Sequence, residues 1–231
     1  MSCLAMDPRI IALEKSRYRP PRPPKKKPPN GFIPFLLILL LLAAAALHAR
    51  QSHAGVFDLP SFLEAGQWSF GVEPEVIISN GTGAGINFKP RFGVNNNLNW
   101  QAIIGTGTGS RKFRIGAIAD FEWFPDHEKQ PGIATPFMVK YSRVDDDGVL
   151  AIGVMPLLYK SFDGEGGRYT PFISFPIGWD MRSAKVTGFT QVALGSLFKL
   201  PTMEKFKYVL EAGFNIHQSH SYISGGFTYY P

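Results

Sequence analysis

The chain has 231 residues, of which 24 are basic and 18 acidic, and its formal net charge is +6. The first 54 residues hold nine of the basic residues and two of the acids, which leaves 15 basic and 16 acidic residues after position 54. Because the later part of the chain is close to neutral, it lacks the positive excess that nucleic-acid binding needs, and no nucleic-acid partner is predicted. The single cysteine, Cys3, excludes disulfides, thiolate metal sites and a lipid-bearing cysteine from the chain beyond the leader.

Residues 1–54 are predicted to be a basic, proline-rich leader that contains a signal peptide. The apolar run Phe32–Leu47 carries no charge and follows the basic run Lys25–Lys27. A membrane-spanning helix needs about 20 apolar residues, so this shorter run is more typical of a secretory signal. We expect cleavage after Ala54 and export of the remaining chain; the alternative interpretation is an uncleaved inner-membrane anchor.

Residues 55–66 form a short N-terminal segment ahead of the first predicted strand. Its apolar residues are Phe57, Leu59, Phe62 and Leu63. Two interpretations stay open for this segment: it lies at a membrane interface, or it plugs the domain formed by residues 67–231.

Residues 67–231 alternate between apolar and polar or small residues, in runs separated by Gly, Asn, Asp and Pro. In one such run Phe113, Ile115 and Phe121 share a face, and the charged residues between them share the other. A period of two predicts β-strands. Ten runs follow this pattern: 67–78, 86–94, 98–104, 113–124, 133–143, 149–160, 170–180, 189–199, 208–216 and 221–230. Their even number and their lengths predict an all-β fold, a closed antiparallel up-and-down transmembrane β-barrel of about ten strands, with eight as the alternative.

The first predicted hairpin, around the loop SNGTGAG, offers a register that satisfies both faces. Opposite charges across a strand pair stabilise each other by roughly 0.2 to 1 kcal/mol. This register pairs Ile78 with Ile86, Val76 with Phe88, Pro74 with Pro90 and Phe70 with Val94 on the apolar face, and Glu75 with Lys89 and Glu73 with Arg91 on the polar face.

The polar faces decide between a soluble and a membrane barrel. They mix charges with glycines, which weaken strands and are hard to explain on a wet surface. In a narrow lumen, small residues make room for ionic side chains. The predicted lumen charge network is Glu73, Glu75, Lys89, Arg91, Arg114, Asp120, Glu122, Lys140, Asp180 and Glu211, and the glycines on the same faces are Gly71, Gly93, Gly116, Gly153, Gly178, Gly195 and Gly213. The alternative is a soluble periplasmic ligand-binding β-barrel with its apolar face inside.

Aromatic residues near the predicted strand ends favour the membrane interpretation, because outer-membrane barrels place aromatic girdles at both interfaces. The predicted girdle residues are Trp68, Phe124, Tyr141, Tyr159, Trp179, Phe198, Tyr208, Tyr229 and Tyr230.

The leader, the strand pattern and the final strand SYISGGFTYYP together resemble the small outer-membrane barrels, such as the OmpA-type membrane domain and the opacity-like proteins. The resemblance covers roughly residues 66–231 and departs from the usual pattern at the end, where Pro231 replaces an aromatic residue. It implies a bacterial outer-membrane location in a Gram-negative envelope, contact with lipid and lipopolysaccharide, and insertion by the barrel assembly machinery.

Two loops and one set of acidic residues partly resemble functional sites, and we interpret all three as structural. Asp145–Asp147 lacks the spacing of an EF-hand, and GTGTGSRK lacks the end of a P-loop and its helix. The acids Glu73, Glu75, Asp120, Glu122, Asp180 and Glu211 could line an omptin-like protease site, but they lie beside Lys and Arg. No metal site and no cofactor are predicted.

One catalytic hypothesis remains, at His217-Gln218-Ser219. The order is similar to that of the outer-membrane lipid A deacylases, and this resemblance makes His217 the base and Ser219 the nucleophile. Alternation instead points His217 into the lumen, and the family's asparagine-rich continuation is missing. The leading functional hypothesis is therefore a non-enzymatic, porin-like outer-membrane barrel with a structural, adhesive or small-solute role, with a lipid A-modifying hydrolase or the soluble ligand-binding barrel as alternatives.

Overall fold

A computed structural model describes residues 60–79, 83–109, 112–144, 147–183 and 185–231. The predicted leader with its cleavage site and residues 55–59 lie outside the described residues. So do parts of four predicted loops, at residues 80–82, 110–111, 145–146 and 184.

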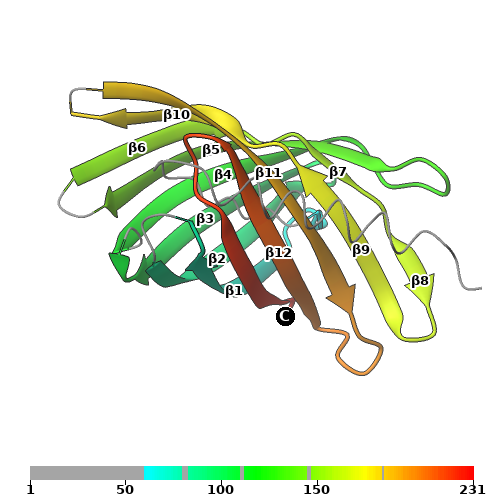
Figure 1. Ribbon diagram of the computed structural model, residues 1–231. Coiled ribbons are helices and arrows are strands. Elements are labelled where there is room, and N and C mark those ends of the chain that lie inside the picture. Colours follow the sequence, from blue (N-terminus) through cyan, green and yellow to red (C-terminus); the bar gives the residue numbers. More distant parts are fainter. Residues whose placement is uncertain (1–59, 80–82, 110–111, 145–146, 184) are drawn as a thin grey trace, which may run out of the picture. The chain divides into compact units, whose positions relative to one another are not determined.

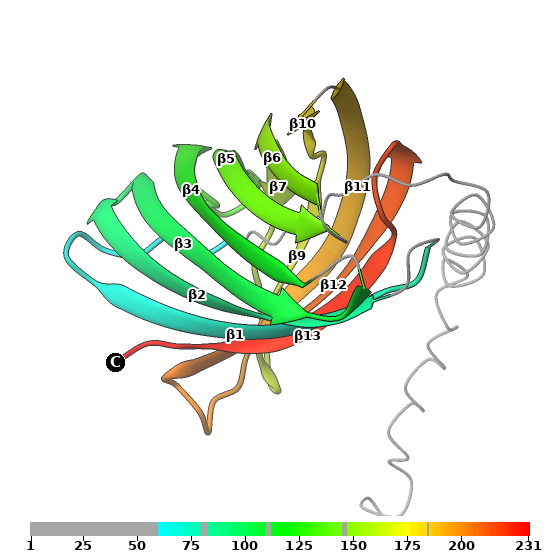
Figure 2. The same cartoon turned by 90° about the vertical axis from the view of Figure 1, so that its left-hand side faces the viewer.

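The described strands close into one antiparallel barrel (Figure 1). Each of the ten strand runs described below pairs with the next run along the chain, and the last strand pairs with the first, with Phe70 opposite Tyr229. Figure 2 shows β13 lying alongside β1. The strands are β1 (Trp68–Ile77), β2 (Gly83–Asn95), β3 (Leu98–Gly107), β4 (Phe113–Phe124), β5 (Gly132–Val144), β6 (Asp147–Val154), β7 (Leu157–Tyr159), β8 (Phe162–Gly164), β9 (Gly167–Ser174), β10 (Ile177–Arg182), β11 (Lys185–Lys199), β12 (Phe206–His217) and β13 (Tyr222–Tyr229). The predicted closed up-and-down barrel is confirmed, with ten strand runs around the wall.

Thirteen strands make ten runs because prolines interrupt two of the predicted strands and a short arm adds another. The run 149–160 divides into β6 and β7 at Pro156, the run 170–180 divides into β9 and β10 at Pro176, and β8 pairs with β9 alone at the barrel rim. Since proline has no N–H, it forms only one of the two hydrogen bonds of a ladder pair. That bond is kept at each proline: Met155 donates to Pro136 at 2.9 Å, Phe175 to Pro156 at 2.9 Å, and Gln191 to Pro176 at 2.9 Å.

Burial along the strands is inverted relative to a water-soluble barrel. The side chains of Arg91 and Arg114 face inward and are each 1% exposed, whereas Ile115 and Phe137 face outward and are 48% and 50% exposed. In the central parts of the described strands, no outward position carries Lys, Arg, Asp or Glu. The two faces therefore have the chemistry that the alternating pattern predicted for them.

The predicted register of the first hairpin is wrong, although its faces are right. β2 begins at Gly83, so Glu73 lies opposite Asn87 and Glu75 opposite Gly85. The predicted direct pairs of Glu75 with Lys89 and of Glu73 with Arg91 do not form, because the connection is shorter than the loop assumed for it. The shift moves each partner four positions, an even number, so every side chain keeps its face.

The lumen has a charged half and an apolar half. Strands β1 to β4 contribute most of the charges, whereas strands β5 to β11 contribute buried apolar side chains on their inward positions. With single residues from β3, β4 and β12, the buried apolar residues form two clusters, one of Ile103, Ile118, Met138, Ala151, Met155 and Phe189 and the other of Ala134, Leu157, Tyr159, Phe172, Leu197 and Val209. Side chains therefore fill the lumen instead of lining a wide channel.

Inward-facing glycines make room for aromatic rings on the neighbouring strand. A Cβ atom at Gly213 would meet the ring of Tyr222, and one at Gly195 would meet the ring of Phe172. Glycine in these two strands is thus a packing requirement of the filled lumen.

Most of the predicted aromatic girdle lies on the outside of the barrel. Trp68 and Phe124 are exposed at strand ends, and the ring of Trp68 lies 4.9 Å from that of Phe92. The prediction for Tyr159 is wrong: its side chain is 5% exposed and points into the lumen. It lies on the same face of its run as Gly153, because the two are an even number of residues apart.

The described part of the N-terminal segment enters the barrel mouth. Ser61 and Leu63 are buried there, and the Leu63 amide donates to Asn99 Oδ1 at 3.2 Å. A Cβ atom at Gly93 would collide with the backbone oxygen of Glu64, so glycine at this position lets the segment pass close to β2. For residues 60–66, the plug interpretation is the one that these contacts support.

Candidate functional site

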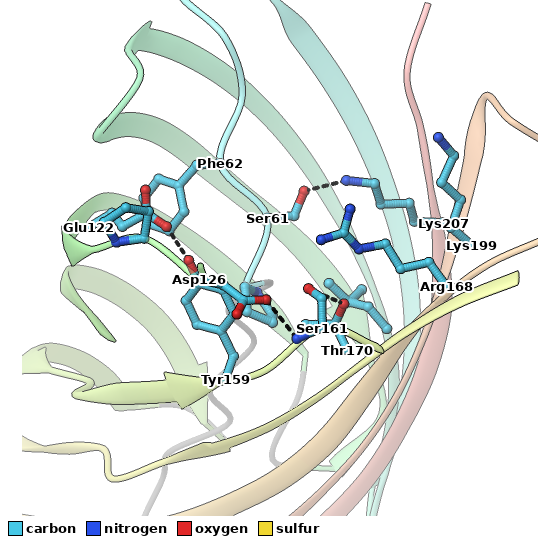
Figure 3. A pocket seen from close by; sticks show the side chains of 13 residues that line it. Ser61, Phe62, Glu122, Asp126, Tyr159, Ser161, Arg168, Thr170, Lys199 and Lys207 are labelled. Carbon is cyan, nitrogen blue, oxygen red and sulfur yellow. Dashed lines mark hydrogen bonds between the residues drawn. The ribbon is translucent and has the colours of Figure 1, made fainter. Parts of the chain in front are cut away.

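The barrel end at which β1 begins and β13 ends is called the termini end here. Figure 1 shows the C-terminus at the same end as the β8–β9 hairpin and the β11–β12 connection. A pocket of about 340 Å³ lies in the mouth of this end (Figure 3). Its lining residues are Pro60, Ser61, Phe62, Glu122, Pro125, Asp126, Tyr159, Ser161, Arg168, Thr170, Leu197, Lys199 and Lys207. We refer to it as the mouth pocket.

One wall of the mouth pocket is fixed by Asp126, in the connection between β4 and β5. Its carboxylate accepts hydrogen bonds from Lys160 Nζ at 2.5 Å and from the Ser161 amide at 2.7 Å. Burial raises the pKa of Asp126, but the hydrogen bonds from Lys160 and Ser161 outweigh burial, so its pKa lies below the ordinary value. Asp126 is therefore a charged tether that ties the β7–β8 connection to the β4–β5 connection.

The opposite wall of the mouth pocket is cationic. Figure 3 shows Arg168, Lys199 and Lys207 together on one side, across from Glu122 and Phe62. Lys207 Nζ donates to Ser61 Oγ at 2.8 Å and lies 4.5 Å from the centre of the Tyr230 ring.

Deeper in the lumen, the charged residues predicted from the sequence are all buried, and several pair with one another. Lys89 contacts Glu73 at 2.8 Å, and Arg91 contacts Asp120 at 2.6 Å. Arg114 forms an ion pair with Glu75. These ion pairs join strands β1, β2 and β4, so the network ties one side of the barrel together across its strands.

Lys140 and Asp180 lie on the other side of the lumen, in one row of the sheet. Ala151 lies opposite both of them, on the strand between. The side chain between Lys140 and Asp180 in this row is therefore only a methyl group.

The ten predicted network residues are four cations and six carboxylates, so two carboxylates are in excess. Two of the carboxylates accept hydrogen bonds from tyrosine hydroxyls: Tyr159 donates to Glu122, and Tyr222 donates to Glu211. A carboxylate buried without a partner is costly, and a phenol O–H supplies a donor without adding charge. These tyrosines complete the lumen network.

The structure does not bring His217 and Ser219 together as a base and its nucleophile. His217 is exposed at the end of β12, which also makes the prediction that it points into the lumen wrong, since the strand ends there. Ser219 is buried, and its hydroxyl donates to Asn215 Oδ1 at 3.4 Å. The buried histidine of this segment is His220, whose Nδ1 lies 3.2 Å from Ser79 Oγ.

Several residues of the mouth pocket were missed by sequence reasoning. Arg168, Lys199 and Lys207 lie two residues from the buried Thr170, Leu197 and Val209, and this spacing could have placed them on the inward faces. Ser61 and Asp126 carry no such signal, because they lie outside the strands.

Within the described ranges, no group of three or more His, Cys, Asp or Glu side chains could hold a metal ion. In that same part of the chain, no helix is long and apolar enough to cross a membrane.

No protein-family model matches the chain, and no curated protein matches it. Among solved structures, it is similar to one described as a de novo design of transmembrane β-barrels, with 11% identity, 74% of this chain and 100% of that chain covered, and a TM-score of 0.36. It is also similar to a bacterial polysaccharide outer membrane secretin, with 9% identity, 71% of this chain and 65% of that chain covered, and a TM-score of 0.39. At these values neither likeness carries an argument about function, and the resemblance to the OmpA-type and opacity-like barrels stays an expectation.

Proposed function

We propose that this chain is an integral β-barrel protein of the bacterial outer membrane, without enzymatic activity, whose role is structural. The observation that carries the proposal is the inverted burial: charged side chains are enclosed, and large apolar side chains cover the outer wall. A barrel in water with this outer surface would expose a far larger apolar patch than soluble monomers tolerate. In a bilayer, the same surface contacts acyl chains.

The dimensions of the wall fit this environment. β1 has 10 residues. Such a strand is about 34 Å long at the usual antiparallel rise, and at a tilt of about 40° it covers roughly 25 Å, the height of the apolar band of outer-membrane barrels.

The filled lumen favours a structural role over solute passage. Buried arginines and lysines occupy the charged half, apolar clusters occupy the other half, and the N-terminal segment lies in the mouth. The connections at the end opposite the termini are only two to five residues long, which leaves little surface for a large receptor or adhesive site. As partners we propose outer-membrane lipid, lipopolysaccharide and the barrel assembly machinery.

An arginine in the middle of the outer wall tests the membrane proposal. Ala117 lies near the centre of β4 and faces outward, so the Ala117→Arg side chain would enter the acyl region. We expect a loss of about 2 to 4 kcal/mol in the free energy of unfolding, measured by urea titration in lipid vesicles. In a water-soluble barrel the same side chain would be hydrated, and the substitution would change the free energy of unfolding very little.

The matched control is Phe113→Arg, at the end of the same strand and on the same face. Near the interface the cost of arginine falls to about 0 to 1 kcal/mol. Equal effects of the two variants, together with release of the wild-type protein from cells by osmotic shock, would refute the membrane assignment.

A further inference from the structure

We propose that the mouth pocket binds a small soluble anion, one that carries a phosphate or carboxylate group and a compact apolar part. The starting point is a row of three cations across neighbouring strands. Arg168 of β9 lies directly opposite Lys199 of β11. The β11–β12 register ends at Phe198 opposite Tyr208, so Lys207 is the next position opposite Lys199.

The row places like charges side by side at the barrel mouth, where Arg168 and Lys199 are exposed and Lys207 is half-buried. Like charges directly opposite each other destabilise a strand pair. The carboxylate next in the row is Asp163, opposite Arg168 on β8, but it is 82% exposed and 3.8 Å from the guanidinium. Among the described residues, the side chain of Lys199 has no hydrogen-bond or ion-pair partner. The structure thus gathers three cations on one wall of the mouth pocket.

The two acids of the other wall lie across the pocket from the row and have other partners. The Asp126 carboxylate is held by Lys160 and Ser161, and Glu122 accepts its hydrogen bond from Tyr159. Both acids are thus engaged on the far side of the pocket, as Figure 3 shows.

The shape and lining of the pocket define the ligand class. Arg168 can form paired hydrogen bonds with an oxyanion, and lysines add point charges to it. Phe62 and Leu197 supply an apolar surface beside the cations. The volume of about 340 Å³ lies within the range of small-molecule sites. Because the pocket lies in the mouth of the barrel, we expect a solute entering along the barrel axis to reach it and a lipid outside the wall not to.

The test is calorimetric titration of the full chain in a non-ionic detergent with phenyl phosphate. We expect binding to a single site that weakens as salt is added. Lys199→Gln should lower the affinity about tenfold, which corresponds to loss of one charge-assisted interaction. Since Lys199 has no partner in the described part of the chain, this variant should retain the barrel, as checked by heat-modifiable gel mobility.

The matched control is Lys185→Gln, at the other end of β11. Lys185 also lies opposite an arginine, Arg182, and both side chains are exposed, as those of Arg168 and Lys199 are, but neither lines the mouth pocket. We expect Lys185→Gln to bind phenyl phosphate as the wild type does.

Two further titrations distinguish the source of the anion. Inorganic phosphate should bind at the same site more weakly, because it lacks the apolar part, and micelles containing phosphatidic acid should not compete. No binding of phenyl phosphate, equal binding by the Lys199 and Lys185 variants, or binding of the lipid alone would each overturn the proposal. The membrane assignment would stand in all three cases, because the Ala117 variant tests it separately.

Discussion

The buried ion pairs of the lumen are arranged across strands and not along them. Arg91 on β2 reaches Asp120 on β4, past the intervening strand β3. Reaching past a strand requires long side chains and small neighbours, and both are present on the inward faces. This pair and the pair of Arg114 on β4 with Glu75 on β1 therefore fix the spacing of strands that are not directly hydrogen-bonded to each other.

Removing one partner of such a pair should be far more damaging than removing both. Asp120→Asn leaves the charge of Arg91 buried without its carboxylate, and we expect a loss of about 3 to 5 kcal/mol in the free energy of unfolding in vesicles. The double variant Asp120→Asn, Arg91→Gln should lose less than the sum of the two single variants. Asp163→Asn, in the exposed pair with Arg168, is the control and should change stability by about 1 kcal/mol or less. Strict additivity of the Asp120 and Arg91 variants would contradict the pairing.

Asp126 predicts a pH dependence at the mouth. Its pKa in the folded protein lies below the ordinary 3.8, so the carboxylate stabilises the fold above that pH, and the stabilisation is lost as the pH falls through the folded-state value. We expect wild type and Asp126→Asn to differ in stability by a constant amount near neutral pH and to converge in acid below that value. Urea midpoints measured across this range check the prediction. A difference that grows on acidification would show that the sign is wrong.

At the scale of the strands, the lumen is filled where the aromatic ring of one strand packs over a glycine of the neighbouring strand. The pairing of β12 with β13 places Gly213 opposite Tyr222, and the ring of Tyr222 covers the glycine. The same strand β13 carries Gly225, where a Cβ atom would meet its nearest neighbour at 3.5 Å, an ordinary contact.

These two glycines should respond differently to the same substitution. Gly213→Ala forces the Tyr222 ring away from its position and from Glu211, and we expect a loss of about 1 to 3 kcal/mol in unfolding free energy. Gly225→Ala should be tolerated to within about 0.5 kcal/mol. Unfolding of both variants in the same vesicles measures the contrast, and similar losses would show that ring packing is not the cause.

Three prolines lie on the apolar side of the barrel wall, each on a different one of three successive strand runs. Pro136, Pro156 and Pro176 each leave one ladder hydrogen bond out. The two apolar clusters pack behind this part of the wall, so side-chain packing supports strands whose backbone pairing is reduced there.

At the scale of the whole barrel, the filled lumen predicts that the protein does not conduct ions steadily. Pairs such as Arg91 with Asp120 occupy the charged half, and the segment around Ser61 and Leu63 occupies the mouth. In planar bilayers we expect insertion without the stable current steps of a water-filled porin, which serves as the positive control. Reproducible open-channel currents would contradict a closed lumen and would favour the small-solute role.

The sequence predicted correctly most of the properties that follow from the alternation of side chains between the two faces of a strand. Alternation over β4 placed Ile115 outside and Arg114 inside. The predicted register of the first hairpin was wrong by four positions, and because four is an even number, every side chain kept its predicted face. The same parity applied to Tyr159 points inward, so its assignment to the girdle followed from its position near a strand end alone. The mouth pocket was less accessible, because Ser61 and Asp126 lie outside the strands and carry no periodic signal.

The sequence by itself determined the strand runs, their antiparallel order and the identity of the charged faces, since each depends on a period of two and on the turns between strands. Only the tertiary structure decided which charged residues pair and which tyrosines donate hydrogen bonds to the excess carboxylates. It also decided that Arg168, Lys199 and Lys207 lie in one row across neighbouring strands. The physical reason is that these contacts depend on the register and curvature of the closed barrel. Closure of the barrel brings residues that are far apart in the chain to the same height along the barrel axis, and the local sequence pattern does not indicate that height.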